Sequence, residues 1–204
     1  MEKRGVILLG VFVFVFSLSG VFAFSGLGDG SSGNPFNITN CTQLQEMSNN
    51  LTAHYQLVNN VDCSDTINWN SGLGFEPVGN STSGFGFEGT FNGNNFNITD
   101  LFINRSSTDY VGLFGSIVEQ YSCPGENFVR DVGLINVNIN GRNRVGGIVG
   151  NSGCVRINNT KIIGNISGKD YIGGIVGVLE NVGILENSNA EINITGINYV
   201  GGNI

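Results

Sequence analysis

The stretch Asn143-Arg144-Val145-Gly146-Gly147-Ile148-Val149-Gly150 is followed by a near copy, Asp170-Tyr171-Ile172-Gly173-Gly174-Ile175-Val176-Gly177. Two related stretches flank this pair, Asp109-Tyr110-Val111-Gly112-Leu113-Phe114-Gly115 before it and Asn198-Tyr199-Val200-Gly201-Gly202 after it. The first glycine of each stretch falls at position 112, 146, 173 or 201, so the steps are 34, 27 and 28 residues. Self-similarity at such a period indicates a repeat architecture.

The remainder of each unit repeats as well. Val137-x-Ile139-x-Gly141, Gly164-x-Ile166-x-Gly168 and Ile192-x-Ile194-x-Gly196 each end five residues before the next first glycine. The longer first step contains Gln120 to Asn127, which we interpret as a loop inserted into one unit.

The pattern inside a unit predicts short strands joined by tight turns. Apolar residues alternate with polar ones or form runs of three to five between Gly and Asn, without a stripe of helical length. A unit of 27–28 residues can circle once as three strands, each pairing with its counterpart one unit later. We therefore predict an all-β fold, a right-handed parallel β-helix. A β-propeller is the main alternative, but its blades need about 40–45 residues each.

The corner before each aromatic residue of the repeat is expected to take the left-handed backbone conformation. The residue at this place is Asp109, Asn143, Asp170 or Asn198. Asp and Asn tolerate that conformation better than other residues with a side chain.

The segment before the repeats contains the one candidate helix, Thr39 to Leu51. Asn40 or Thr42 could cap it, and Leu44, Met47 and Leu51 fall on one face. We expect this helix to seal the first coil against strand addition.

Four segments are predicted along the chain. Residues 1–23 form a secretory signal with a basic start, an apolar run and a small-residue cleavage site, although an uncleaved membrane anchor remains the alternative. Residues 24–35 are a Gly/Ser-rich linker, 36–108 are the N-terminal cap and first coils, and 109–204 are the repeats. Because the last unit stops where its pattern would continue, we expect the repeat region to be incomplete at its C-terminal end.

Composition limits the possible functions. The 204 residues include 32 Gly, 40% are hydrophobic and 12% are charged, so there is enough apolar material for a core and disorder is excluded as the main state. Nine Lys and Arg oppose sixteen Asp and Glu, for a net charge of −7 without a basic run. These numbers exclude a groove that follows nucleic acid phosphates.

The four cysteines predict disulfides, because an even number in an exported chain is typical of them. We favour Cys41–Cys63 and Cys123–Cys154 among the three possible connectivities, and free buried thiols remain the alternative. A zinc site needs closer cysteine pairs. Nine sequons are possible glycosylation sites, or simply a product of Asn-rich turns before Thr-rich strands: Asn37, Asn40, Asn50, Asn80, Asn97, Asn104, Asn158, Asn165 and Asn193.

A family resemblance rests on Gly-Gly-Ile-Val-Gly in units of 27–28 residues. This unit resembles the GLUG motif of secreted and surface proteins, which also occurs as an accessory region in some immunoglobulin A proteases. The stretches Phe75-Glu76-Pro77-Val78-Gly79 and Phe87-x-Gly89-Thr90-Phe91-Asn92-Gly93 resemble the leader that precedes such repeats in large prokaryotic surface proteins. The resemblance covers about residues 36 to 204. It implies a β-helical extracellular region, often adhesin-like, and brings no catalytic residues.

The sequence offers no catalytic, cofactor or metal site. Catalysis by paired carboxylates would need in-phase acids, but Asp109 and Asp170 alternate with Asn143 and Asn198. The single histidine, His54, is expected to be buried and hydrogen-bonded. Arg130 and Arg156 align in adjacent units without a matching acid cluster.

One residue position per unit is a candidate ligand or partner strip: Tyr110, Arg144, Tyr171 and Tyr199. Such a strip could contact sugar rings or another protein, or could be purely structural stacking. We predict a non-catalytic structural or adhesive segment, secreted or on the cell surface, whose partner is a cell-surface glycan or another surface protein. It would meet a membrane only through the signal segment or a C-terminal anchor. The alternatives are a polysaccharide-binding or polysaccharide-processing β-helix and an accessory region of a larger secreted protease.

Overall fold

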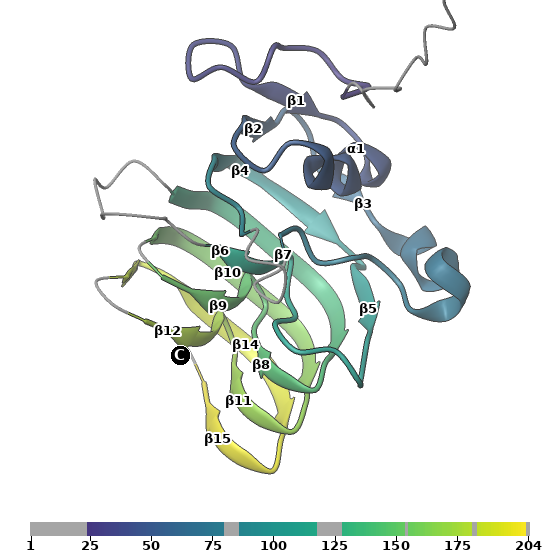
Figure 1. Ribbon diagram of the computed structural model, residues 1–204, viewed down its shortest axis with the longest axis vertical. Helices are drawn as coiled ribbons and strands as arrows, with labels where there is room; N and C mark the ends of the chain where they lie inside the picture. The colour runs from purple at the N-terminus through teal and green to yellow at the C-terminus, as the bar shows by residue number, and fades with distance from the viewer. Residues whose placement is uncertain (1–23, 80–85, 118–127, 154, 181–182, 203–204) are drawn as a thin grey trace, which may run out of the picture.

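The computed structural model describes residues 24–79, 86–117, 128–153, 155–180 and 183–202. These residues form a mostly β structure with two short helical regions near its N-terminal end (Figure 1). Five predictions lie outside the described residues: the signal segment 1–23, the inserted loop 120–127, Cys123, Cys154 and Asn80.

The strands form three sheets. The largest has nine strands in the order β1-β2-β4-β7-β10-β13, with β3 also on β4, β5 on β7 and β14 on β10. Its strands are β1 (Phe36–Ile38), β2 (His54–Leu57), β3 (Val61–Asp62), β4 (Thr90–Thr99), β5 (Phe102–Asn104), β7 (Phe128–Asn140), β10 (Arg156–Ser167), β13 (Ile184–Glu186) and β14 (Asn189–Thr195). The second sheet contains β8 (Asn143–Val145), β11 (Asp170–Gly173) and β15 (Asn198–Gly201), and the third contains β6 (Phe114–Ile117), β9 (Val149–Ser152) and β12 (Val176–Leu179).

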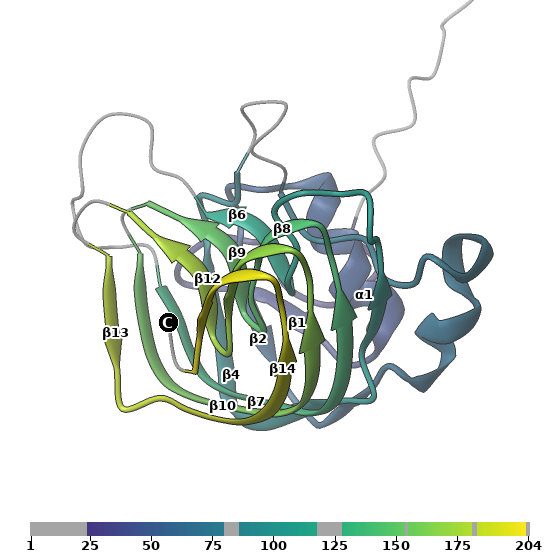
Figure 2. The ribbon, with the colours of Figure 1, turned by 90° about the horizontal axis from the view of Figure 1, so that it is seen from below.

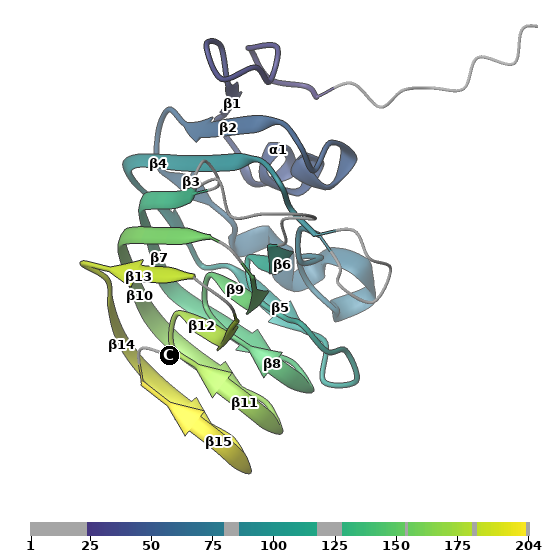
Figure 3. The ribbon, with the colours of Figure 1, turned by 60° about the vertical axis from the view of Figure 1, so that its left-hand side comes forward.

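Each strand pairs in parallel with the equivalent strand of the neighbouring unit. Asp170 lies opposite Asn143 on one side and Asn198 on the other, and Val176 lies opposite Val149. Successive units therefore overlie one another when the molecule is viewed along the stack (Figure 2). From the side, the largest sheet descends from β1, β2 and β4 to β13 and β14 (Figure 3). The prediction of an all-β chain with parallel pairing between units is confirmed.

The core consists of apolar side chains stacked over their counterparts. Ile157 on β10 lies opposite Val129 on β7, and Ile166 lies opposite Ile139, all buried. Full burial of such a side chain contributes about 1.5–3 kcal/mol. The last unit is less covered, since Val200 remains 48% exposed.

The first coil contains a shorter helix than the sequence predicted. Helix α1 spans Cys41–Glu46 and continues as a 3-10 turn over Met47–Asn49. The prediction that Asn40 caps the helix is confirmed, because its Oδ1 accepts a hydrogen bond from the Gln43 N–H at 3.0 Å. Leu44 and Met47 are buried in the core. A second 3-10 region, η2 (Ser64–Gly72), follows β3.

Residues 24–35 pack against the first strands. Leu27 accepts a hydrogen bond from the Asn37 N–H on β1 at 2.7 Å, and Gly30 accepts one from the His54 N–H on β2 at 2.9 Å. The Phe24 ring lies 4.5 Å from that of Phe36. This segment, expected as a linker, thus covers backbone groups of β1 that an edge strand would otherwise present to another chain.

Glycine allows the units to approach at the repeated Gly-Gly pairs. The Gly147 N–H donates to the Gly174 carbonyl in the next unit at 3.2 Å, and Gly174 donates to Gly202 at 2.7 Å. A Cβ atom on Gly147 would lie only 2.6 Å from the Gly174 carbonyl oxygen, whereas a Cβ on Gly202 would meet nothing within 4 Å.

We predict that Gly147→Ala lowers the free energy of unfolding by about 2 kcal/mol, because the added methyl group forces two backbones apart. Gly202→Ala, at the same place in the last unit, is the matched control and should change stability far less. Urea unfolding followed by circular dichroism measures both. Equal effects of the two substitutions would contradict the close-approach explanation.

The predicted disulfide Cys41–Cys63 is present and joins α1 to the residue that follows β3. Both cysteines are buried. The chain between the two cysteines forms two short strands, β2 and β3, and the disulfide anchors the end of the second.

Replacing both Cys41 and Cys63 with Ala should lower the free energy of unfolding by about 3 kcal/mol, because the bond closes a loop whose ends are 22 residues apart. Denaturant unfolding of the variant and the parent chain measures the loss. Reduction of the parent chain should cost at least as much, because it breaks this bond together with any other disulfide of the chain. A variant as stable as the oxidised parent would show that this bond does not constrain the unfolded chain.

Candidate functional site

The candidate site is the strip of four side chains at one register position, here called the Tyr/Arg ladder: Tyr110, Arg144, Tyr171 and Tyr199. The residues on either side of Tyr171 pair with those beside Arg144 and beside Tyr199. Val111 forms a bridge with Val145, which places Tyr110 in the same row. The structure therefore brings all four predicted residues together.

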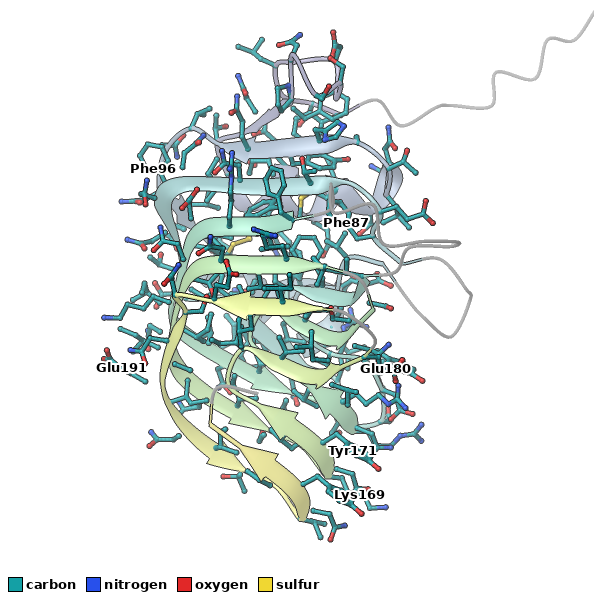
Figure 4. All side chains as sticks on the ribbon, turned by 90° about the vertical axis from the view of Figure 1, so that its left-hand side faces the viewer. Phe87, Phe96, Lys169, Tyr171, Glu180 and Glu191 are labelled. Atoms are coloured by element: carbon teal, nitrogen blue, oxygen red, sulfur yellow. A yellow bond between two sulfur atoms is a disulfide. The ribbon has the colours of Figure 1, made fainter. Side chains whose placement is uncertain are left out.

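The ladder is stacked, and its residues pass from half-buried Tyr110 and Arg144 to exposed Tyr171 and Tyr199. The Tyr171 and Tyr199 rings are parallel within 4°, with centroids 4.7 Å apart, and the Arg144 guanidinium carbon lies 5.3 Å from the Tyr110 ring centroid. Tyr171 is 41% exposed and Tyr199 is 72% exposed. Figure 4 shows Tyr171 on the side of the molecule that also carries Lys169 and Glu180, away from Phe96 and Glu191.

The backbone of the ladder is strained. The φ angles of Tyr110, Arg144, Tyr171 and Tyr199 are 61°, 57°, 60° and 52°. The prediction that the preceding Asp or Asn takes the left-handed conformation is therefore wrong. Those carboxyl and amide groups instead bond along the stack, as where the Asn198 amide donates to the Asp170 carboxylate at 2.6 Å.

A left-handed residue with a bulky side chain costs roughly 1–2 kcal/mol. Such strain clusters at functional sites, where the surrounding structure holds it in place. Gly or Asn would meet the backbone requirement at lower cost. The recurrence of Tyr and Arg there therefore favours a role for the side chains themselves.

Charged groups of both signs surround the ladder. The Arg144 guanidinium donates to the Asn151 side-chain oxygen at 2.8 Å and to Glu180 at 3.2 Å. Two residues before Arg144, the Arg142 Nε donates to the carboxylate of Asp109 in the preceding unit at 2.7 Å. That hydrogen bond holds the pKa of the Asp109 carboxyl below its usual range, with the Asn143 N–H assisting.

The other polar residues singled out in the sequence lie on the largest sheet and not on the strands of the ladder. His54 is half-buried, and its Nδ1 lies 2.7 Å from the Thr90 hydroxyl. Arg130 pairs in register with Asn158 and Arg156 with Phe128, so the predicted alignment of the two arginines is wrong by two residues. Within the described ranges, no three His, Cys, Asp or Glu side chains gather closely enough to hold a metal ion.

The sequon asparagines that the structure describes lie at the surface. Asn40, Asn50, Asn104, Asn165 and Asn193 are exposed, and Asn37, Asn97 and Asn158 are half-buried. Several bond to amide side chains of a neighbouring unit, as in the donations from Asn193 to Asn165 at 3.1 Å and from Asn140 to Asn104 at 3.0 Å. These contacts show that the asparagines also have a structural use, whether or not they carry glycans.

Sequence comparison with known proteins identifies relatives that match part of this chain. Halomucin from Haloquadratum walsbyi is 37% identical over 131 residues, which are 61% of this chain and 1% of halomucin. A protein provisionally described as a Gly-rich membrane protein, from Evansella cellulosilytica, is 40% identical over 98 residues, 47% of this chain and 11% of that protein. The chain thus spans a small part of the length of these relatives.

One solved structure shares the fold. It is a protein from Bacteroides ovatus provisionally described as an immunoglobulin A1 protease, with a TM-score of 0.56 and 19% sequence identity. The match covers 83% of this chain and 69% of the other. No family model matches the chain. In the part of the chain that the structure describes, no helix is both long and apolar enough to cross a membrane.

We predict that Asp109→Asn lowers the free energy of unfolding at pH 7 by less than about 1 kcal/mol, because its ion pair with Arg142 is partly exposed. A carboxyl whose pKa is lower in the folded chain stabilises it above the ordinary pKa, and this contribution is lost as the pH falls through the lowered value. The difference between parent and variant should therefore shrink from about pH 4 downward. Urea unfolding across that range measures it, and a constant difference down to pH 2 would contradict the ion pair.

Proposed function

We propose that this chain is a non-catalytic segment of a secreted or cell-surface protein, and that it adheres to another surface protein through the Tyr/Arg ladder. In this proposal the stacked parallel strands form a right-handed β-helix of GLUG-type coils, and the N-terminal 23 residues direct export. The single observation that carries the proposal is the strained, exposed and repeated ladder.

Two observations support an extracellular location. One relative is named halomucin, and another is provisionally described as a Gly-rich membrane protein. The Cys41–Cys63 disulfide is typical of an oxidising compartment.

A repetitive stack suits a structural role because each unit is stabilised by its neighbours, so length can grow without a new fold. The exposed ladder then presents the same kind of side chain along the stack. Asp170 lies between Asn143 and Asn198 in its row, which supports a non-catalytic role for this row because glycoside hydrolysis needs two carboxyl groups.

The geometry of the rings favours a protein partner over sugar stacking. Tyr171 and Tyr199 each cover one face of the other's ring, with centroids 4.7 Å apart, so these facing surfaces are closed to a sugar ring, while ring edges and hydroxyl groups line up along the stack. Tyr and Arg side chains of this kind are enriched at the centres of protein interfaces. The alternative of an accessory region of a larger protease rests on the likeness to the Bacteroides protein, which at 19% identity concerns the fold alone.

The double variant Tyr171→Ala and Tyr199→Ala tests this function. We expect it to lose at least tenfold in affinity for cells of the producing organism while its midpoint of thermal unfolding changes by only a few degrees. Ile67→Ala, an exposed apolar residue at 55% on η2, is the control and should bind as the parent does.

Three outcomes would count against the proposal. Unchanged binding of the double variant excludes the ladder as the adhesive surface. A large loss of stability assigns it a structural role instead. Binding that survives protease treatment of the cells but not glycan removal indicates a carbohydrate partner.

A further inference from the structure

A groove of about 590 Å³ lies on the outer face of the largest sheet, away from the Tyr/Arg ladder. Its floor is made by three neighbouring strands, β2, β4 and β7, which Figure 3 shows one below another. Residues 32–35, from the segment that covers β1, form one wall. The groove is named here the Arg130 groove, and its floor residues are His54, Gln56, Thr90, Asn92, Phe128 and Arg130.

Strand alternation explains why these side chains face outward. Tyr55, Phe91 and Val129 occupy one row across the three strands, and all are buried in the core. Their neighbours in sequence must therefore point to the other face of the sheet. One outward row contains Gln56, Asn92 and Arg130, and the other begins with His54 opposite Thr90.

Arg130 gives the groove a positive charge in a chain whose net charge is −7. Its guanidinium carbon lies 4.4 Å from the centroid of the Phe128 ring, and its Nε lies 3.5 Å from the Asp131 carboxylate. The described residues provide no hydrogen-bond acceptor for its terminal N–H groups, and the contact with the Phe128 ring holds the guanidinium in place.

The remaining floor residues supply donors and acceptors of the kind that bind hydroxyl groups. The Asn92 side-chain oxygen accepts the Asn94 N–H at 3.0 Å, which orients the amide. Gln56 donates to Asn37 at 2.8 Å. The His54 Nδ1 forms a hydrogen bond with the Thr90 hydroxyl, and its Nε2, on the other side of the ring, takes no part in that bond.

We propose that the Arg130 groove binds a carboxylate-bearing sugar unit of an acidic polysaccharide. The Arg130 guanidinium donates two parallel hydrogen bonds to the two oxygens of the sugar carboxylate, which is the pairing that an Arg side chain forms best. The amides of Gln56 and Asn92 bind sugar hydroxyl groups, and Phe128 and Pro35 contact the apolar parts of the ring. A volume of about 590 Å³ falls within the usual range for small-ligand sites.

This proposal does not depend on the ladder. The two surfaces lie on different sheets, because the groove is built by β2, β4 and β7 and three ladder residues sit on β8, β11 and β15. A chain could therefore keep either surface when the other is removed.

Calorimetric titration of the folded chain with tri-galacturonate tests the proposal. We expect measurable binding, at least tenfold weaker binding of the fully methyl-esterified trimer, and at least tenfold weaker binding of tri-galacturonate to Arg130→Gln. Lys161→Gln removes the same charge at an exposed position on β10 and should bind within twofold of the parent. The Tyr171→Ala, Tyr199→Ala variant should also bind as the parent does.

Four results would overturn the proposal. Equal affinity for the methyl ester would show that the carboxylate is not recognised, and equal loss in Lys161→Gln would reduce the effect to net charge. Binding lost in the ladder variant would place the sugar on the other surface. No binding by the parent chain, whose fold is verified by its thermal unfolding, would exclude a uronate site in this groove.

Discussion

Every unit of this molecule must bring its backbone within hydrogen-bonding distance of the next, at the corners as well as along the strands. At the Gly-Gly pairs this means contacts such as the Gly174 N–H on the Gly202 carbonyl at 2.7 Å, with no room for a Cβ atom on Gly174. Once that distance is fixed, each residue lies over its counterpart. The composition of a whole row then follows from what a single position requires, apolar inside and amide or aromatic outside.

The outer rows show how modest interactions accumulate in such a stack. Asn140 donates to Asn104 at 3.0 Å and Asn193 donates to Asn165 at 3.1 Å, in each case between neighbouring units. An exposed hydrogen bond of this type adds about 0.5–1.5 kcal/mol at most, less than one fully buried Ile. The amide rows therefore select the register of the strands, while the apolar rows supply most of the stability.

The repeat made the parallel pairing, the apolar rows and the position of the ladder predictable, because all three depend on residues that recur at a fixed spacing. Features that occur once were harder to predict. The break between β2 and β3, the packing of residues 24–35 on β1 and the offset of Arg130 from Arg156 each depend on a single local contact. The groove joins residues 32–35 to Arg130, and only the strand order brings segments so distant in sequence together. The outward alternation around Tyr55, Phe91 and Val129 was the signal that could have revealed its floor.

The backbone of the ladder lowers stability by more than the stacking of its side chains restores. Left-handed Tyr and Arg residues cost roughly 1–2 kcal/mol each, and ring stacking returns about 0.5–1.5 kcal/mol per pair. Stacking at 4.7 Å between Tyr171 and Tyr199 thus offsets only part of the strain of two residues. Paired strand residues on both sides of each ladder position hold the unfavourable backbone in place. Since Gly at the same positions would remove the strain, the folding of the stack alone does not account for Tyr there, which is why the proposed function is assigned to the exposed rings.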